Sequence, residues 1–345
     1  MRKQAPYTVA VVGATGTVGA ALLEILAERD FPVAELRPLA SARSAGERVD
    51  FRGQSLVVRD VAGCDFAGVD IAFFSAGGAV SREHVPRAVA AGAVVIDNTA
   101  EFRREDDVPL VVAEVNPEAI AQYAKRRIIA NPNCSTMQML VALAPIHRAV
   151  GIDRINVATY QSVSGAGRSG MQELGRQTAA LLSFQQPAVE TFPARIAFNV
   201  IPQGGDFTDN GYTTEEMKLV WETRKILGDE SIQVNPTCVR VPVFYGHSEA
   251  VHIETRERIT AAAARKLLRA APGVEVLDRR VAGGYPTAAG QAAGQDAVFV
   301  GRIREDISHP RGLDMWIVAD NIRKGAALNA VQLAELLVAL PTGAN

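Results

Sequence analysis

The chain has 345 residues, of which 48% are hydrophobic and 21% are charged, and its formal net charge at pH 7 is -2. The length predicts about two domains, and the composition is that of a globular protein and excludes a disordered chain. With so little net charge and no basic tail, there is no electrostatic case for nucleic acid or an anionic membrane as a partner.

The N-terminal run "TVAVVG" is short and β-branched and ends at Gly13, so it predicts a strand and not a signal peptide. No window reaches the ~18 to 20 apolar residues of a membrane span. The three cysteines, at positions 64, 134 and 238, have no Cys-x-x-Cys spacing, which argues against a disulfide framework and a zinc cluster. We therefore expect a cytoplasmic protein with no metal and a small-molecule partner.

The first 130 residues alternate strand-like and helix-like segments. "TVAVVG", "PVAELRPLAS", "DIAFFSA", "AVVIDNT" and "RRIIANP" predict strands, and "TVGAALLEILAERD" and "REHVPRAVAAG" predict helices. This alternation is typical of βαβ units in a parallel sheet. We expect an α/β protein whose Rossmann-type domain covers residues 1–132.

A glycine-rich segment, "GATGTVG", follows the first predicted strand and leads into a helix. A tight glycine turn lets the backbone approach a pyrophosphate, and the helix N-terminus supplies N–H groups. The spacing departs from the common G-x-G-x-x-G, and glycines used only for packing are the alternative, but the position in a βαβ unit favours a dinucleotide site. The expected contacts are Gly13, Thr15, Gly16, Thr17, Val18 and Gly19.

The end of the second predicted strand indicates which dinucleotide binds. An NAD site usually has an acidic residue about 20 residues on, which holds the ribose 2'-hydroxyl. This chain has "SARS" there, and Ser41, Arg43 and Ser44 suit a 2'-phosphate, which favours NADP. A solvated surface loop is the alternative.

The segment "NPNCST" places Cys134 between a turn and the helical run "CSTMQMLVALAPIHRAV". A thiolate at the start of a helix is stabilised by unpaired N–H groups and by the helix dipole. Taken alone, Cys134 is equally consistent with a nucleophile and with a small buried residue. Cys64 and Cys238 lack this setting, and we expect both to serve packing.

From about residue 154 the strands become longer and alternating. "RINVATYQSV", "ARIAFNVIP", "VNPTCVRVPVF", "SEAVHIETRE" and "AVFVGRIRE" predict an antiparallel or mixed sheet with one face covered by helices. A polar loop leads into the amphipathic helix "TEEMKLVWETRKIL", and "RVAGGYPTAAGQAAGQ" is expected to be an irregular loop. We expect an α+β catalytic and dimerisation domain over residues 133–320. A helix over 321–345 either closes a core or returns to the cofactor domain with Asn321 at its mouth.

Five histidines could assist a nucleophilic thiol. His147 lies 13 residues after the cysteine on the same predicted helix, about 20 Å away, which is too far. His84 and His309 are in charged, turn-like segments and are expected at the surface. His247 begins a strand and is the preferred proton-transfer residue, whereas the odd spacing puts His252 on the opposite face, in a structural role.

Three cationic residues are candidates for substrate binding. Arg240 lies in an apolar strand, where burial requires a carboxylate from the protein or a ligand. Lys218 and Arg103 are further candidates, with exposed salt bridges as their alternative. Three cations exceed the need of one carboxylate and suit a substrate that also involves phosphate.

Together "GATGTVG", "SARSAG", "NPNCST", "YQSVSGAG", "FNVIPQ", "EEMK" and "RVPVFYGHSE" resemble the aspartate-semialdehyde dehydrogenases, in family order, over nearly the whole chain. The resemblance implies an NADP-dependent enzyme that interconverts L-aspartate 4-semialdehyde plus phosphate and L-aspartyl 4-phosphate through a cysteine thioester. It implies a place in lysine, diaminopimelate, threonine, methionine and isoleucine biosynthesis. The alternatives are N-acetyl-gamma-glutamyl-phosphate reductase, which acts on a longer, acylated substrate, and a non-catalytic NADP-binding scaffold.

The resemblance also implies roles for single residues. Cys134 would be the nucleophile, His247 the proton donor and acceptor, and Gln161 would orient the acyl intermediate. The residues implied to bind the amino-acid end are Arg240 and Glu215, those for phosphate are Arg103 and Lys218, and those near the nicotinamide are Ser164, Gly165 and Asn321. A homodimer or a dimer of dimers, formed by packing a sheet face across a two-fold axis, is implied as well.

Overall fold

The computed structural model describes residues 6–340. They divide into two compact units, one containing the residues up to 133 together with those from 326 onward, the other containing residues 134–325. Within residues 6–340, no helix is both long and apolar enough to cross a membrane.

The first unit contains a six-stranded sheet in which every pair of neighbouring strands is parallel, as predicted. The strand order is β5-β2-β1-β6-β7-β8, so β1 lies between the two halves of the sheet. β1, β6, β7 and β8 are buried along their whole length, because helices cover both faces of such a sheet. The bounds are β1 Tyr7–Val12, β2 Val33–Ala40, β5 Arg59–Asp60, β6 Ile71–Phe74, β7 Val94–Asp97 and β8 Ile128–Ala130.

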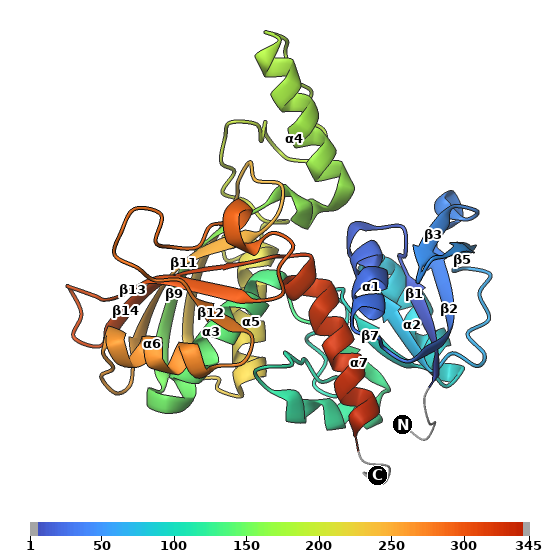
Figure 1. The fold of residues 1–345 in the computed structure, drawn as a ribbon, viewed down its shortest axis with the longest axis horizontal. Helices are drawn as coiled ribbons and strands as arrows, with labels where there is room; N and C mark the ends of the chain where they lie inside the picture. The colour runs from blue at the N-terminus through green and yellow to red at the C-terminus, as the bar shows by residue number, and fades with distance from the viewer. Residues whose placement is uncertain (1–5, 341–345) are drawn as a thin grey trace. The chain divides into compact units, whose positions relative to one another are not determined.

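Figure 1 shows helices α1, α2 and α7 of this unit. Helix α1 buries Leu22, Leu23, Ile25 and Leu26, which lie on its inward side. The bounds are α1 Thr17–Glu28, α2 Gly78–Ala90, α7 Asn329–Ala339, and the 3-10 helices η1 Ala42–Ser44 and η2 Pro117–Lys125. A hairpin of β3 Arg48–Phe51 and β4 Gln54–Val57 completes the unit.

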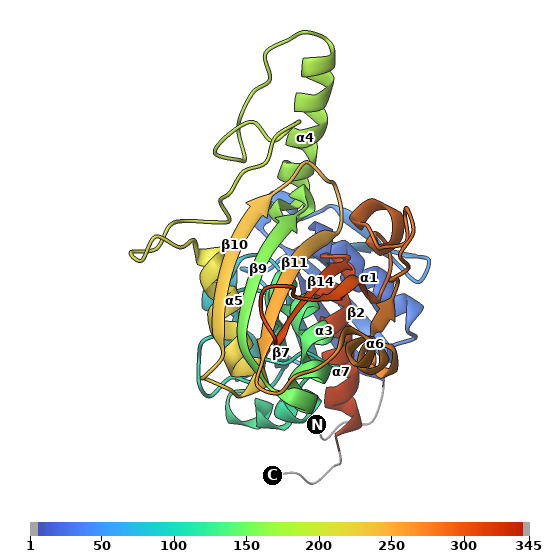
Figure 2. The same ribbon diagram turned by 90° about the vertical axis from the view of Figure 1, so that its left-hand side faces the viewer.

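The second unit contains the predicted mixed sheet, in the order β10-β9-β11-β14-β13-β12. The pairs β10–β9 and β12–β13 are parallel and the other pairs are antiparallel. Figure 2 shows β10, β9, β11 and β14 side by side, with helices α3 and α5 behind them. The strands are β9 Ile152–Gln161, β10 Gln233–Arg240, β11 His247–Thr255, β12 Val274–Val276, β13 Val298–Glu305 and β14 Gly312–Ala319.

Three helices of this unit, α3 Cys134–Val150, α5 Thr214–Leu227 and α6 Ala261–Ala270, pack against the sheet. Helix α4 Gly167–Leu182 projects beyond the strand ends in Figures 1 and 2, next to the 3-10 helix η3 Val163–Ala166. The π-helix η5 Arg323–Leu328 continues into α7, so the predicted C-terminal helix is present.

Some sequence-based expectations for these segments are wrong. "ARIAFNVIP" is not a strand: only Ile201 forms a bridge, with Arg240. Phe198 has a φ of 56° and is 64% exposed, so the left-handed backbone interrupts the expected alternation. The loop "RVAGGYPTAAGQAAGQ" contains the π-helix η4 Ala288–Ala292.

His84 is also misplaced by the sequence-based expectation of a surface position. Its side chain is buried on the inward side of α2, together with Ser81, Val85 and Ala88. These residues repeat at helical spacing, and the charged residues around them had masked that pattern.

Candidate active site

The glycine-rich loop packs closely against neighbouring backbone, because two of its glycines have no room for a side chain. Gly13 has a φ of 91°, and a Cβ there would lie 2.5 Å from the carbonyl oxygen of Ser75. A Cβ on Gly19 would lie 2.0 Å from the carbonyl oxygen of Gly13. No side chain caps the N-terminus of α1 at Gly16. Glycine is therefore required at both positions for packing, and the loop leads into a helix N-terminus without a side-chain cap.

The predicted 2'-phosphate segment directly follows β2. Because Val12 of β1 pairs with Leu39 of β2, the carboxyl ends of both strands lie at the same sheet edge. Ser41 and Arg43 are exposed just beyond this edge, and η1 is a short turn with no core of its own. Within residues 6–340 the Arg43 side chain forms neither an ion pair nor a hydrogen bond.

Arg103 also belongs to the first unit. It is buried, and its Nη2 donates to the carbonyl oxygen of Asn98, 2.8 Å away. The nearby carboxyl group of Asp97 accepts from Ser81 and Thr99. Burial raises the pKa of Asp97, opposed by those hydrogen bonds and by the charge of Arg103.

Cys134 is the first residue of α3 and is partly exposed. A Cβ on Gly325 would lie 2.7 Å from the Cβ of Cys134, so a glycine is required where the backbone passes the thiol. The buried side chain of Gln161, at the end of β9, donates through Nε2 to Oγ of Ser135, 3.0 Å away. This bond places an amide beside the residue that follows the thiol.

The predicted substrate-binding residues of α5 form an ion pair. Nζ of Lys218 lies 2.9 Å from Oε2 of Glu215, one helical turn away. The start of the helix is fixed by a capping box between Thr213 and Glu216. The second carboxyl oxygen of Glu215 lies 3.5 Å from Nε2 of Gln161, which joins α5 to the end of β9.

Arg240 is half-buried at the end of β10, and its Nη1 donates to the carbonyl oxygen of Ser162 at 2.8 Å. No carboxylate of the described residues forms an ion pair with it. The sequence required a carboxylate from the protein or from a ligand. Within residues 6–340 the protein does not supply that carboxylate.

His247 is completely buried at the start of β11. Its Nδ1 accepts from the backbone N–H of Ser162, 3.1 Å away, so the neutral ring carries its hydrogen on Nε2. That Nε2 forms no hydrogen bond within the described part of the chain. Burial, and after it the charge of Arg240, lower the pKa of His247 to about 3, and the charge of Glu215 opposes the shift.

A loop network supports the imidazole. Oδ1 of Asn321 accepts from the backbone N–H of Gly246 and from the hydroxyl groups of Ser162 and Ser164, all at 3.0 to 3.1 Å. A Cβ on Gly165 would lie 2.7 Å from Nη1 of Arg240 and 3.5 Å from Nε2 of His247. A side chain at position 165 would therefore fill the space beside both groups.

Sequence reasoning missed Ser162, which contacts both His247 and Arg240. The only signal was its position directly after Gln161 in "YQSVSGAG". The structure places Cys134 and the predicted residues from Gln161 to Asn321 in the second unit, including the predicted nicotinamide contacts, whereas Arg103 and the predicted cofactor contacts of residues 13–44 lie in the first. Cys238 is buried, and burial raises the pKa of its thiol, in keeping with a packing role.

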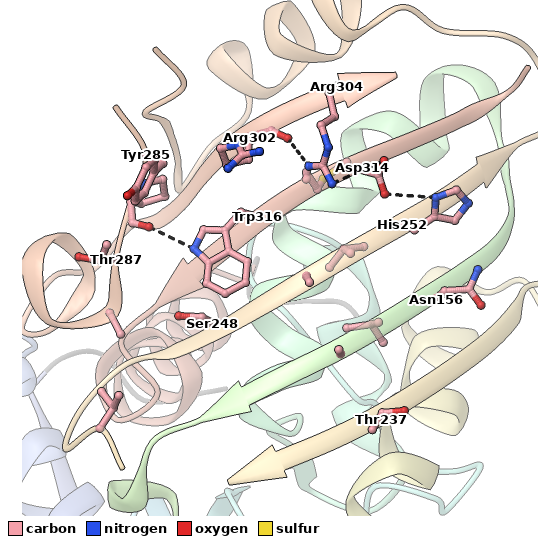
Figure 3. A pocket seen from close by; sticks show the side chains of 18 of the residues that line it. Asn156, Thr237, Ser248, His252, Tyr285, Thr287, Arg302, Arg304, Asp314 and Trp316 are labelled. Atoms are coloured by element: carbon pink, nitrogen blue, oxygen red, sulfur yellow. Dashed lines mark hydrogen bonds and ion pairs between the residues drawn. The ribbon is translucent and has the colours of Figure 1, made fainter. Parts of the chain in front are cut away.

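The face of the second sheet that lies opposite to the His247 side chain contains a groove, as Figure 3 shows. The groove has a volume of about 880 Å³ and lies over β9, β11 and β14. Small side chains such as Ala158 and Ala250 line it, together with the large side chain of Trp316. His252 lies on this face, with Nδ1 3.4 Å from Oδ1 of Asp314, so it points away from His247 as predicted.

Comparisons with known proteins match both units. A family model described as the semialdehyde dehydrogenase NAD binding domain matches residues 8–123, and one described as the semialdehyde dehydrogenase dimerisation domain matches residues 143–324. The chain is 62% identical to the aspartate-semialdehyde dehydrogenase of Legionella pneumophila, over 95% of each chain. It is 58% identical to aspartate-semialdehyde dehydrogenase 2 of Vibrio cholerae, over 96% of this chain and 98% of that one.

Solved structures agree with the sequence comparisons. Aspartate semialdehyde dehydrogenase II of Vibrio cholerae, complexed with ASA, has a TM-score of 0.95 and 58% identity, and the match covers 97% of this chain and 99% of that one. Aspartate semialdehyde dehydrogenase of Candida albicans, with NADP, has a TM-score of 0.75 and 27% identity, covering 96% and 98%. These matches extend over both units.

Proposed function

Since the chain belongs to the aspartate-semialdehyde dehydrogenase family, we propose that it interconverts L-aspartate 4-semialdehyde plus phosphate and L-aspartyl 4-phosphate, with NADP as the hydride carrier. The observation that carries the substrate assignment is Arg240, a half-buried guanidinium with which no carboxylate of residues 6–340 forms an ion pair. It suits the carboxylate of an amino-acid substrate. The alternative of a non-catalytic scaffold is not favoured, because the Arg240 guanidinium and the His247 imidazole both keep N–H groups that are available to a ligand.

The covalent step that we propose begins with the Cys134 thiolate, which attacks the aldehyde carbon and forms a C–S bond, so that the carbonyl oxygen becomes an alkoxide. Nε2 of His247 carries its hydrogen and has no acceptor in the described structure, so it can donate to that oxygen. This geometry supports the donor half of the predicted role. Gln161, held by Ser135, would orient the same adduct.

The second half of the reaction would transfer the acyl group to phosphate. NADP, when bound, accepts the hydride that leaves the adduct as the alkoxide collapses to a thioester. Phosphate then attacks the thioester carbon, the C–S bond breaks, and Cys134 leaves as a thiolate. Lys218 and Arg103 are the cations proposed to hold phosphate, and Glu215 and Arg240 the amino-acid end. The amino-acid pathways and the cytoplasmic location expected from the sequence belong to the same proposal.

The NADP assignment rests on residues 41–44. A guanidinium that has no carboxylate partner in residues 6–340, beside two serines at the end of β2, suits a 2'-phosphate. The glycine loop at the same sheet edge suits the pyrophosphate, because it leads into the N-terminus of α1, which no side chain caps. The solved relative from Candida albicans is titled as a complex with NADP.

Replacing Arg43 by alanine should weaken NADP+ binding by about tenfold or more and leave NAD+ binding nearly unchanged, because only NADP+ carries the 2'-phosphate. Calorimetric titration of both cofactors measures the difference. Arg43→Lys keeps the charge but not the two-pronged geometry, so its affinity for NADP+ should lie between those of wild type and Arg43→Ala. Equal losses for NADP+ and NAD+ would remove the assignment.

The substrate assignment is tested by assaying both candidate semialdehydes with phosphate and NADP+. Aspartate semialdehyde should be oxidised, and N-acetylglutamate semialdehyde should have a kcat/KM lower by at least about 10²-fold, because its acyl group removes the amino group's charge and adds bulk. A preference for the acylated substrate would establish N-acetyl-gamma-glutamyl-phosphate reductase instead.

We also propose a homodimer, which could pair into a dimer of dimers, formed through the sheet face of Figure 3. The face is uncovered in a single chain, carries small apolar residues, and belongs to the part matched by the dimerisation-domain model. Ala250→Glu would place a charge on this face and should shift the protein towards monomer in sedimentation experiments. Ala263→Glu, on the exposed side of α6, is the matched control. Sedimentation of the unmodified chain as a monomer at micromolar concentration would contradict the dimer.

A further inference from the structure

Among the buried acids of the second unit that take no part in the reaction described above, Glu249 stands out by its lack of hydrogen bonds within residues 6–340. Glu249 is completely buried on β11, two residues after His247, and side chains two apart on a strand point to the same face. Neither of its carboxyl oxygens has a hydrogen-bond partner within residues 6–340. An ionised carboxylate in that position would be very costly, and burial raises the pKa of Glu249 well above its usual range.

The elements around Glu249 supply no cation that would favour its charged form. On β9 its direct neighbour is Thr159, and on β14 it is Ile317. Beyond Thr159 lies Cys238 of β10, whose buried thiol has a raised pKa and stays neutral. The acid of α5 on that side, Glu216, accepts from the backbone N–H of Cys238 and caps its own helix. The carboxyl group of Glu249 is therefore held in its neutral, hydrogen-donating form.

Gln138 of α3 connects this carboxyl group to the site. It lies four residues after Cys134, one turn along the same helix. Its Nε2 donates to the backbone carbonyl oxygen of His247, 3.4 Å away, while its Oε1 receives no hydrogen bond in the described structure. This bond brings the Gln138 amide to the backbone two residues before Glu249 on β11. The amide also opposes the rise in the pKa of Glu249, although no hydrogen bond of standard geometry joins the two side chains.

The polarity of the Gln138 amide determines how the two side chains interact. Because a carbonyl oxygen accepts only, the amide must keep its NH₂ group towards His247. Its oxygen then needs a donor, and a protonated Glu249 carries one. A neutral acid therefore offers the donor that the Gln138 oxygen lacks, whereas a charged one would leave that oxygen unmatched.

We propose that Glu249 is a positioning residue: held protonated, it fixes the Gln138 amide, which holds the backbone carbonyl of His247 at a set distance from helix α3 and its first residue, Cys134. The inference rests on the proposed function for its catalytic consequence. Its structural part, a neutral buried acid joined to an amide, stands without any assumption about the substrate.

The protonation state is tested without substrate by comparing the thermal stability of wild type and Glu249→Gln between pH 5 and pH 8. A group with a raised pKa in the folded state favours folding below its unfolded pKa, and that contribution is lost as pH rises. The melting temperature of E249Q minus that of wild type should therefore increase steadily from pH 5 to pH 8. A constant difference, or one that changes in the opposite direction, would overturn the neutral acid.

The positioning role is tested by activity. E249Q keeps a donor and an acceptor of the same shape, and its kcat should stay within about twofold of wild type. Glu249→Leu removes the donor and should lower kcat by about tenfold or more with little change in KM, because displaced catalytic groups affect the chemical step first. Val251→Ala, which removes buried volume on the same face of β11, is the control and should lower the melting temperature but not kcat.

Each outcome of the activity measurement decides the question. Equal losses in E249Q and E249L, or normal kcat in E249L, would overturn the positioning role. Should E249L fail to fold, Gln138→Leu interrupts the same connection and should give the same selective loss in kcat. If every variant and the wild type are inactive with aspartate semialdehyde, the proposed function fails while the stability comparison still reports on Glu249.

Discussion

Cys134→Ser should abolish the oxidation of aspartate semialdehyde, with kcat lower by at least about 10³-fold, while NADP+ still binds. Serine keeps the size of the side chain and the start of α3, but at neutral pH its hydroxyl group is a far weaker nucleophile than a thiolate. No thioester can then form. The measurement is the rate of NADPH formation in the presence of phosphate, together with a calorimetric titration of NADP+.

Cys64→Ser provides the matched control for the loss of a thiol. Cys64 lies in the first unit, and burial raises the pKa of its thiol, so it has the character of a packing residue. This variant should keep wild-type turnover. Near-normal oxidation by Cys134→Ser would remove the covalent mechanism, and failure of that variant to bind NADP+ would show that the loss of activity comes from misfolding.

His247→Gln should lower kcat by about 10²-fold or more, because the alkoxide would lose the hydrogen bond from Nε2 of His247. In the structure this Nε2 has no hydrogen-bond partner within residues 6–340. His252→Gln is the control, because His252 occupies the other face of the same strand, beside Asp314. Turnover should be unaffected in the control. Equal losses of kcat in both variants would show that the effect comes from a disturbed sheet and not from the loss of a catalytic group.

The same variant should change how stability depends on pH. The pKa of His247 is lowered to about 3 in the folded protein, from an ordinary value of 6.5, so only the unfolded chain takes up the proton as pH falls below 6.5. Wild type should lose stability between about pH 6.5 and pH 3, by at most ~5 kcal/mol, and His247→Gln should lose less. Denaturant titrations at several pH values measure this, and parallel pH curves for the two proteins would contradict a neutral buried imidazole.

The features that the sequence predicted well depend on local patterns. The alternation of the first 130 residues predicted the parallel sheet, and the setting of Cys134 at a helix start is found at α3. The separation of His247 and His252 onto two faces followed from the two-residue period of a strand. Such patterns lie within a few neighbouring residues, so they can be read before the chain is folded.

The features that the sequence did not predict depend on contacts between distant segments. Ser162 holds both His247 and Arg240, and Asn321 ties Gly246 to two serines, although about 75 residues or more separate each pair along the chain. The burial of His84 and Glu249 likewise depends on which segments pack over them. The charged residues around His84 in the sequence indicate a surface position instead. The left-handed backbone at Phe198 has no signal in "ARIAFNVIP".

The central claim, that an acyl group is carried on Cys134 until phosphate removes it, is tested most directly by rapid mixing of the enzyme with aspartate semialdehyde and NADP+. Without phosphate, the account predicts a burst of at most one NADPH per Cys134 followed by a slow phase. With phosphate, it predicts continuous turnover. Continuous NADPH formation at the same rate without phosphate would contradict the account, because the acyl group would then be leaving the cysteine by another route.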